Sequence, residues 1–378
     1  MTLQYALLSY HGTNNLGDEI QSLAARQFLP RVDYYVDRET MDSFVPIDKS
    51  NPVILILNGW LCYQPQNWPP SPYLQPLLIS LHITAEKSYG CLSPAERLLA
   101  EPAINYLKRL GPVGARDQHT LTLLRNAGVD CYYSGCLTLT LQRPSVSCEQ
   151  DLIVLNDVPA RARRYVVRKS SKRIIETSHG GYTKPNPEER FIEAEALLEL
   201  YAKASCVVTT NLHAALPCLA FGTPVLLLDI ASDQYRFSGL HDLVHHASVK
   251  AYMQSKFNYD VNNPPPNKPD YLFLRESLAG TVQNFIANAE TYPERLRDPL
   301  SIEERLEVLI GIKNAQAKLC SEYAEVLSSS SWRLTKPLRY LARLLHIKSA
   351  SVRHLIDFVS KVLGSVRKPK GLLERWLL

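Results

Sequence analysis

The sequence predicts an α/β fold with two doubly wound, Rossmann-like domains that face a cleft, followed by a C-terminal helical tail. Short apolar runs typical of buried strands alternate with helical patterns from residue 3 to residue 229, which favours parallel sheets covered by helices. A polar, proline-containing stretch at residues 143–150 separates two such series. The length of 378 residues suits two domains with an appendage. We therefore predict one domain at residues 1–146 and a second at residues 150–300.

The first domain is predicted to begin with a strand at residues 3–10, a loop at residues 11–17 and a helix at about residues 18–29. Asp18 and Glu19 suit the start of this helix, because carboxylates favour the positive end of the helix dipole. Along the rest of this domain we expect strands at residues 52–58, 77–83 and 131–134, and helices at residues 93–110 and 120–127.

The second domain repeats the alternation and ends in helical segments. We expect strands at residues 152–156, 173–177, 207–210 and 225–229, and helices at residues 161–169, 187–204 and 302–327. The last of these forms a separate segment at residues 301–327, and a basic amphipathic tail follows at residues 328–378.

The stretch from Val207 to Asp229 reads as a strand, a loop, a short helix of small residues, a Gly-Thr-Pro turn and a second strand. Ligands of parallel sheets bind at the carboxyl ends of the strands, so Asn211, Leu212 and His213 lie where a site would form. The alternative interpretation is a plain α/β connection whose histidine caps the helix.

The loop after the first strand is a second candidate site, for a hydroxylated acceptor. Its two glycines permit close approach of a ligand to the backbone, and its asparagines offer amides to hydroxyl groups. The two carboxylates oppose an anion at this helix start, which favours a sugar. The candidate acceptor-binding residues are His11, Asn14, Asn15, Asp18 and Glu19. The alternative is an ordinary turn with a carboxylate cap.

Three further residues follow predicted strands and could bind an anion. Arg116 lies between a strand-like Gly-Pro-Val-Gly-Ala segment and a helix, and its planar guanidinium suits a carboxylate or a phosphate. Alternatively, Arg116 pairs with Asp117 or with another surface acid. His179 and Arg236 occupy comparable positions in the second domain, where each could also be an ordinary surface residue.

Composition excludes several classes of protein. No run of about eighteen uncharged apolar residues exists, so we expect no membrane span, and the N-terminus lacks the basic start and cleavage site of a secretory signal. The eight cysteines form no Cys-x-x-Cys pair, as in a reduced cytosolic protein. We therefore expect a cytoplasmic protein without a metal site.

The tail carries a charge opposite to that of the body. Residues 331–378 hold eleven Lys or Arg against Asp357 and Glu374, a net charge of +9, whereas the whole chain carries +5. Leucines and valines share helical faces between these cations, which is typical of helices at an anionic membrane surface. The alternatives are a helical hairpin packed on the body and a partner-binding helix. A nucleic-acid partner is not expected, because interleaved aromatic residues and known nucleic-acid motifs are missing.

An ordered series of motifs resembles the polysaccharide pyruvyl transferase family over about residues 5–245. The motifs are His11 to Glu19, Val113 to Asp117, Ser134 to Cys136, Leu212-His213 with Gly222-Thr223-Pro224, and Arg236 to Leu240. The resemblance implies a GT-B-like fold. It also implies transfer of the enolpyruvyl unit of phosphoenolpyruvate onto a sugar of a bacterial surface polysaccharide, or of its lipid-linked precursor, as a ketal.

The resemblance further implies that Arg116 holds the donor anion and that His213 contacts its phosphate or donates a proton. Asn211 stands where the family usually has arginine, and an amide carries no charge for the anionic donor. Arg236 and His179 could make up for that charge. Phosphoenolpyruvate would be a co-substrate, with no further cofactor. Alternatively, the donor is a nucleotide sugar and the chain a GT-B-type glycosyltransferase, or the chain is a non-catalytic descendant that binds a glycan or a partner.

The serine-rich segment at residues 328–339 resembles an element found at the ends of bacterial polysaccharide glycosyltransferases. Together with the basic tail, it predicts a cytoplasmic transferase attached peripherally to the inner face of the cell membrane.

Overall fold

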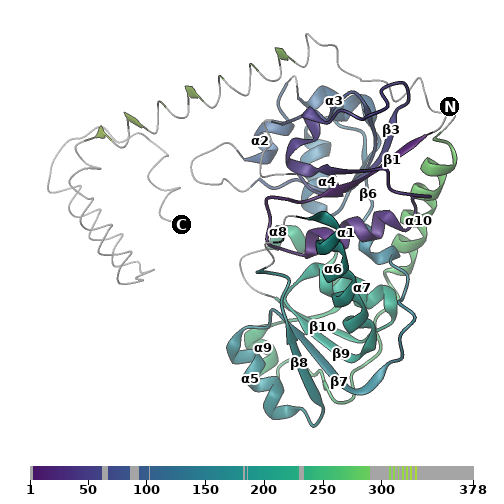
Figure 1. Cartoon of the computed structure of the whole chain (residues 1–378). Helices are drawn as coiled ribbons and strands as arrows, with labels where there is room; N and C mark the ends of the chain where they lie inside the picture. Colours follow the sequence, from purple (N-terminus) through teal and green to yellow (C-terminus); the bar gives the residue numbers. More distant parts are fainter. Residues whose placement is uncertain are drawn as a thin grey trace. The chain divides into compact units, whose positions relative to one another are not determined.

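The computed structural model describes residues 3–61, 67–85, 93–101, 103–181, 184, 186–229 and 234–289, and scattered positions between 306 and 329. These residues form two parallel sheets with helices packed against them (Figure 1). Both sheets belong to one compact unit of the chain. The predicted α/β class with two Rossmann-like domains is thereby confirmed.

The first sheet has the strand order β2-β1-β3-β4-β5-β6, and all of its pairs are parallel. Its strands are β1 (Gln4–Ser9), β2 (Tyr34–Asp37), β3 (Val53–Trp60), β4 (Leu74–His82), β5 (Val113–Ala115) and β6 (Cys131–Tyr133). The helical segments of this half are α1 (Gly17–Arg26), η1 (Arg38–Ser43), α2 (Pro94–Leu98), α3 (Ile104–Leu110), α4 (Gln118–Asn126) and η2 (Leu137–Thr140).

The second sheet has the order β11-β10-β9-β7-β8 and is also parallel throughout. Its strands are β7 (Glu149–Asn156), β8 (Arg173–Thr177), β9 (Ala204–Thr209), β10 (Val225–Asp229) and β11 (His245–Ser248). The helical segments of this half are α5 (Ala160–Lys169), α6 (Pro187–Lys203), α7 (Leu212–Phe221), α8 (Gln234–Phe237), η3 (His241–Leu243), α9 (Val249–Met253) and α10 (Leu272–Ala287).

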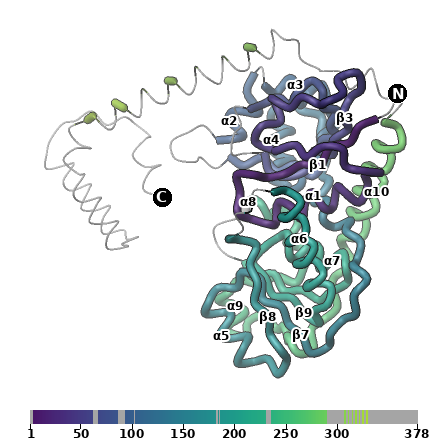
Figure 2. The backbone as a smooth tube through the Cα atoms, in the orientation of Figure 1, coloured from purple at the N-terminus to yellow at the C-terminus, as the bar shows by residue number. Residues whose placement is uncertain are grey.

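A continuous apolar core joins the two sheets. Helix α1 of the first half packs against α6 and α7 of the second, so that Ile20 and Leu23 share one cluster with Phe191 and Leu216. Burial of such side chains stabilises the fold by about 1.5–3 kcal/mol each. Figure 2 shows the chain returning to the first half through α10, where Phe285 packs with residues of β1 and β3. The two halves therefore meet across a packed interface.

The structure differs from the sequence-based expectation in several elements of the sheets and helices. The helix expected at residues 93–110 is two short helices, α2 and α3. The sequence has Pro102 between them, and proline removes a helical hydrogen bond and crowds the preceding turn. Strands β2 and β11 were not expected, because each has four residues and lacks a long apolar run. Helix α10 was also not expected from the sequence.

The predicted helix at residues 301–327 and the tail at residues 328–378 lie almost entirely outside the described residues. The described positions Leu306, Glu307 and Ile310 are helical. Among the described residues, we find no helix with the length and hydropathy needed to cross a membrane.

Candidate functional site

The start of α1 is the point where the carboxyl edges of the two sheets meet. The backbone N–H of Leu16 donates to the carbonyl oxygen of His179 over 2.8 Å. A side chain at Gly17 would place its first carbon 3.1 Å from Nδ1 of His179 and 3.2 Å from Nδ1 of His213. Glycine leaves room here for two histidines that follow different strands of the second sheet, and any side chain would crowd both rings.

His213, the second residue of α7, is buried, and its Nε2 has no hydrogen-bond partner among the described residues. Burial lowers the pKa of His213 well below its usual value, and the charges of Arg116 and Arg236 lower it further. Its backbone contact with Gly17 opposes this shift. The imidazole is therefore neutral near pH 7 when no anion is bound.

Arg116 follows β5 and is fully buried, with 0% of its surface exposed. Its Nη1 lies 3.5 Å from Oε1 of Gln21, and its Nε lies 3.5 Å from Oδ2 of Asp117. Its Nη2 has no hydrogen-bond partner among the described residues. A buried guanidinium with long contacts and an unused donor can accept an anionic ligand at little loss of existing bonds.

His82 and Asp117 form a buried pair beside Arg116, and the sequence analysis did not identify His82 as a site residue. Nδ1 of His82 lies 2.6 Å from Oδ2 of Asp117, whose other oxygen accepts from the N–H of Thr120 and caps α4. Burial, followed by the charge of Arg116, lowers the pKa of His82 to about 4. The neutral ring thus donates from Nδ1 and leaves Nε2 as an unpartnered buried acceptor.

Arg236 brings a second cation from the second half to the first. Its Cζ lies 4.9 Å from the ring centroid of Trp60, at the end of β3. Ser238, two residues later, anchors this segment on α4, because its carbonyl accepts from the N–H of Gln118 over 3.0 Å and its Oγ accepts from the N–H of His119 over 3.1 Å. The charge of Arg236 lowers the pKa of both His82 and His213. Both arginines therefore act on the same two histidines.

Asn211 is engaged in a different network. Its Nδ2 donates to Oδ1 of Asn156 over 3.0 Å and to Oδ2 of Asp157. Asp157 also accepts from the backbone N–H of His179 over 2.9 Å. Both amide hydrogens of Asn211 are therefore used to fix the loops that hold His179. The neighbouring Leu212 is buried in the apolar core.

His179 itself is placed by three contacts rather than aimed freely at a ligand. Its Nε2 lies 2.9 Å from the hydroxyl of Tyr201, its backbone is held by Asp157, and its Nδ1 faces Gly17. Burial lowers the pKa of His179 to about 4, although Asp157 opposes the shift. Both His179 and His213 face Gly17, and the neutral His179 ring does not supply the charge that position 211 lacks.

The candidate acceptor residues divide into buried and accessible ones. Glu19 is buried, and its Oε1 accepts from Nε of Arg190 over 2.5 Å. Asp18 is also buried, where it accepts from Gln21 and faces Arg38. These carboxylates form ion pairs that join α1 to α6 and to η1. The presence of two acidic residues at the start of α1 is therefore explained without a bound ligand.

The accessible residues of this loop are His11, Asn14 and Asn15. His11 is about half exposed, with Nδ1 at 3.3 Å from Oδ2 of Asp37, and Asn14 is exposed. Oδ1 of Asn15 accepts from the N–H of Gly17 and shapes the turn into α1. An acceptor sugar would therefore reach His11 and Asn14 first.

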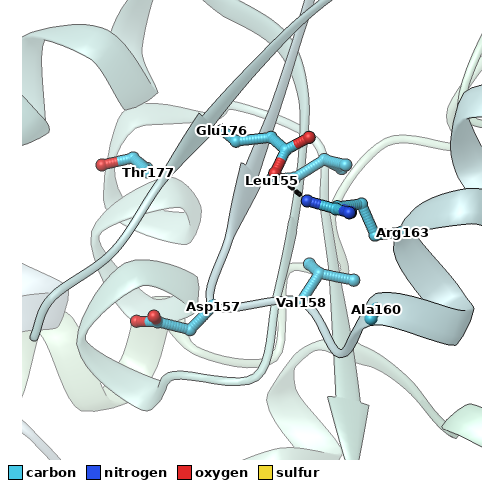
Figure 3. A pocket seen from close by; sticks show the side chains of 7 residues that line it. All are labelled: Leu155, Asp157, Val158, Ala160, Arg163, Glu176 and Thr177. Carbon is cyan, nitrogen blue, oxygen red and sulfur yellow. Dashed lines mark hydrogen bonds and ion pairs between the residues drawn. The ribbon is translucent and has the colours of Figure 1, made fainter.

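A separate cavity of about 220 Å³ lies at the carboxyl ends of β7 and β8 (Figure 3). Its lining residues are Leu155, Asp157, Val158, Ala160, Arg163, Glu176 and Thr177. Arg163 is paired with Glu176 over 2.9 Å, and Figure 3 shows the carboxylate of Asp157 pointing away from this pair. The charge of the one arginine is thus already neutralised.

Comparisons with known proteins agree with the motif-based resemblance. A family model described as polysaccharide pyruvyl transferase matches residues 15–232, more than half of the chain. That range includes Arg116, Asn211 and His213. No curated protein matches the sequence.

Several solved structures are similar in general layout. An uncharacterized protein from Klebsiella pneumoniae is 12% identical, with a TM-score of 0.36 over 62% of this chain and 87% of that one. The UDP-GlcNAc 2-epimerase of Methanocaldococcus jannaschii is 10% identical, with a TM-score of 0.44 over 76% and 100%. The heptosyltransferase WaaC of E. coli is 13% identical, with a TM-score of 0.31 over 68% and 99%. The family assignment therefore rests on the sequence model.

Proposed function

Since the chain belongs to the polysaccharide pyruvyl transferase family and is a polysaccharide-modifying transferase, we propose that it moves the enolpyruvyl unit of phosphoenolpyruvate onto a sugar as a ketal. The observation that carries this proposal is the group of buried Arg116, His82 and His213 with the half-buried Arg236. In this group two cations from different halves act on two neutral histidines. Phosphoenolpyruvate has a carboxylate and a phosphate, and two guanidinium groups match those two anions.

Arg236 is a candidate for the cation that position 211 lacks, because Asn211 carries no charge for an anionic donor. The family's usual arginine would stand at position 211, but here the amide is bonded to Asn156 and Asp157. Arg236 is in the second half as well, and its guanidinium crosses to the end of β3. We infer that it supplies the cation that position 211 lacks.

The reaction needs one proton on carbon and the departure of phosphate. A general acid protonates the methylene carbon of phosphoenolpyruvate while one sugar hydroxyl adds to the neighbouring carbon. The bond from that carbon to the phosphate oxygen breaks, and a second sugar hydroxyl closes the ketal. Of the two hydroxyl protons, one replaces the proton given to the methylene carbon and the other leaves with the phosphate.

His213 is our candidate for the proton donor or for the phosphate contact. A neutral imidazole cannot act as a general acid, but a bound dianion favours the protonated ring and raises its pKa. The same argument applies to His82, whose Nε2 has no partner among the described residues. Binding of the donor would thus favour protonation of the histidines that take part in the reaction.

The acceptor and the location of the protein at a membrane are proposed from the sequence. We propose that His11, Asn14 and Asn15 contact a sugar of a surface polysaccharide or of its lipid-linked precursor. The basic residues 331–378 would hold the protein on the inner face of the membrane, where each cation near anionic lipid contributes about 1 kcal/mol. Deleting these residues should release the protein from anionic vesicles, and unchanged sedimentation with the vesicles would refute this attachment.

The nucleotide-sugar alternative has less support from the site. In the cavity at the carboxyl ends of β7 and β8, Arg163 and Glu176 neutralise each other, and Asp157 leaves the lining with a net negative charge. A diphosphate would meet repulsion there. The volume of about 220 Å³ is also below the 300 Å³ or more that is usual for ligand pockets.

Phosphate release tests the proposed reaction. The full chain is incubated with phosphoenolpyruvate and a panel of saccharide acceptors, and phosphate and the acid-labile ketal are measured together. The expected result is acceptor-dependent release of one phosphate per ketal, lost in His213→Gln and retained in Arg163→Gln, whose arginine is paired on the surface. Saturable binding of nucleotide sugars with no effect of phosphoenolpyruvate would instead support the glycosyltransferase.

A further inference from the structure

A group of metal-ligand side chains lies outside the anion site, between η3 and β11. His241, Asp242 and His246 each offer one ligand atom, and these atoms lie within 4.8 Å of one another. No metal site was expected from the sequence, because the cysteines form no Cys-x-x-Cys pair and no other ligand cluster was recognised. The fold brings His241 and His246 together by placing β11 directly after η3.

Both histidines are fixed in the form that binds a metal ion. Nδ1 of His241 lies 2.8 Å from the carbonyl oxygen of Phe237, and Nδ1 of His246 lies 3.0 Å from Oδ2 of Asp229. Carbonyl and carboxylate oxygens only accept, so Nδ1 of each ring carries a hydrogen, and Nε2 is the nitrogen that a metal ion would bind. Metal-binding histidines typically have this oxygen contact at the second ring nitrogen.

The distances suit a small divalent ion. Nε2 of His241 lies 3.6 Å from Oδ1 of Asp242. Ligands at about 2.0–2.2 Å from a tetrahedral zinc ion are about 3.4 Å apart. The ring centroids of His241 and His246 are 4.8 Å apart at 87°, and both side chains are about one third exposed. Zinc ligand atoms on one ion are at most about 4 Å apart, and the three ligand atoms here lie within 4.8 Å of one another. Small rotations of the histidine rings would close the remaining gap of about 1 Å.

The local charge favours a cation. Asp242 and Asp229 place two carboxylates beside the histidines, and the ammonium group of Lys268 donates to the backbone carbonyl of Asp242 over 3.0 Å. One lysine against two carboxylates leaves net negative charge. A divalent ion would reverse the sign of this local charge, and its attraction to the carboxylates would contribute favourable Coulomb energy.

We propose that His241, Asp242 and His246 bind one divalent transition-metal ion of the zinc class. The ion would join η3 to β11 and, through the bond from His241 to Phe237, would steady the end of α8 that carries Arg236. The site is structural, because its ligands are not among the buried groups assigned to the donor. This inference does not depend on the identity of the donor.

Metal titration of the full chain, purified without a histidine tag and stripped with a chelator, tests the proposal. Zinc is followed by calorimetry and cobalt by its visible absorption, in the absence of phosphoenolpyruvate. We expect one ion per chain, a raised unfolding temperature, and at least tenfold weaker binding in His246→Gln and His241→Gln.

His245→Gln is the matched control. His245 is next to His246 on β11, but its Nε2 is 2.9 Å from the carbonyl oxygen of Pro266 and is therefore occupied. Its substitution should leave metal affinity unchanged. The proposal is overturned if the parent protein binds no ion with micromolar or better affinity, or if the His245 and His246 variants weaken binding equally.

Discussion

The carboxyl edges of the two sheets differ in how their buried polar and charged groups are hydrogen-bonded. At the edge of the first sheet, Arg116 and Asp117 are fully buried beside His82, and several donors and acceptors there have no partner among the described residues. At the edge of the second sheet, Asp157 accepts from Ser178, His179 and Asn211. At the first edge the unpartnered groups include those of Arg116 and His82, whereas at the second edge Asp157 and Asn211 hold the loops around His213, whose Nε2 also has no partner among the described residues.

Under the proposed function, the anion site does not need an arginine at position 211. The second sheet supplies Asn211 where the family has arginine, and that amide stabilises a loop. In the proposed site the cations are Arg116 and Arg236, and the Arg236 guanidinium lies over Trp60 at the end of β3. Variants at the two edges should therefore separate ligand binding from stability.

The largest effect is expected for Arg116→Lys. Lysine keeps the charge but cannot donate two parallel hydrogen bonds, so kcat/KM for phosphoenolpyruvate should fall by about 10²–10³, as for the loss of a strong charge-stabilising donor. Steady-state phosphate release measures the change. Arg163→Lys on the exposed surface is the control, and thermal unfolding of both variants separates a folding defect from a binding defect.

Arg236→Met should be the next largest, with a decrease in kcat/KM of about 10². Arg236 as a whole is half-buried and its guanidinium lies over Trp60, so its removal should affect the donor more than the fold. Protection of the protein by phosphoenolpyruvate against thermal unfolding should shrink in parallel. A variant with parental KM and kcat would show that Arg116 alone holds the anion and that position 211 has no substitute.

The buried histidines predict that stability falls in mild acid. The pKa of His179 is about 4 in the folded chain and about 6.5 when unfolded, so its contribution is full above pH 6.5 and is lost as the pH falls towards 4. Between pH 8 and pH 5 this one residue should account for about 2 kcal/mol of the free energy of unfolding. Urea unfolding at both pH values checks the prediction, and His179→Gln should remove that part of the slope. An equal slope in the variant would contradict it.

The sequence was sufficient for the alternating strands and for residues that directly follow them, because period and strand ends are local signals. Arg116, His179 and His213 were found in this way, and the structure places them around α1. His82 was missed although its strand was expected, because only the pairing with Asp117, 35 residues later, reveals its environment. The burial of Asp18 and Glu19 was also missed, since it depends on Arg38 and on Arg190 from the other half.

The smallest effect should follow Asn211→Ala, which tests the second edge directly. The alanine removes two hydrogen bonds, to Asn156 and Asp157, and each is worth about 1 kcal/mol. We expect a loss of about 1–2 kcal/mol in the free energy of unfolding, with KM for phosphoenolpyruvate within about threefold of the parent, because the amide does not face the donor cations. Urea unfolding and phosphate release, both measured on one preparation, distinguish an effect on stability from an effect on donor binding. A large rise in KM with unchanged stability would instead make Asn211 a direct contact of the donor, and the two edges would then share the anion.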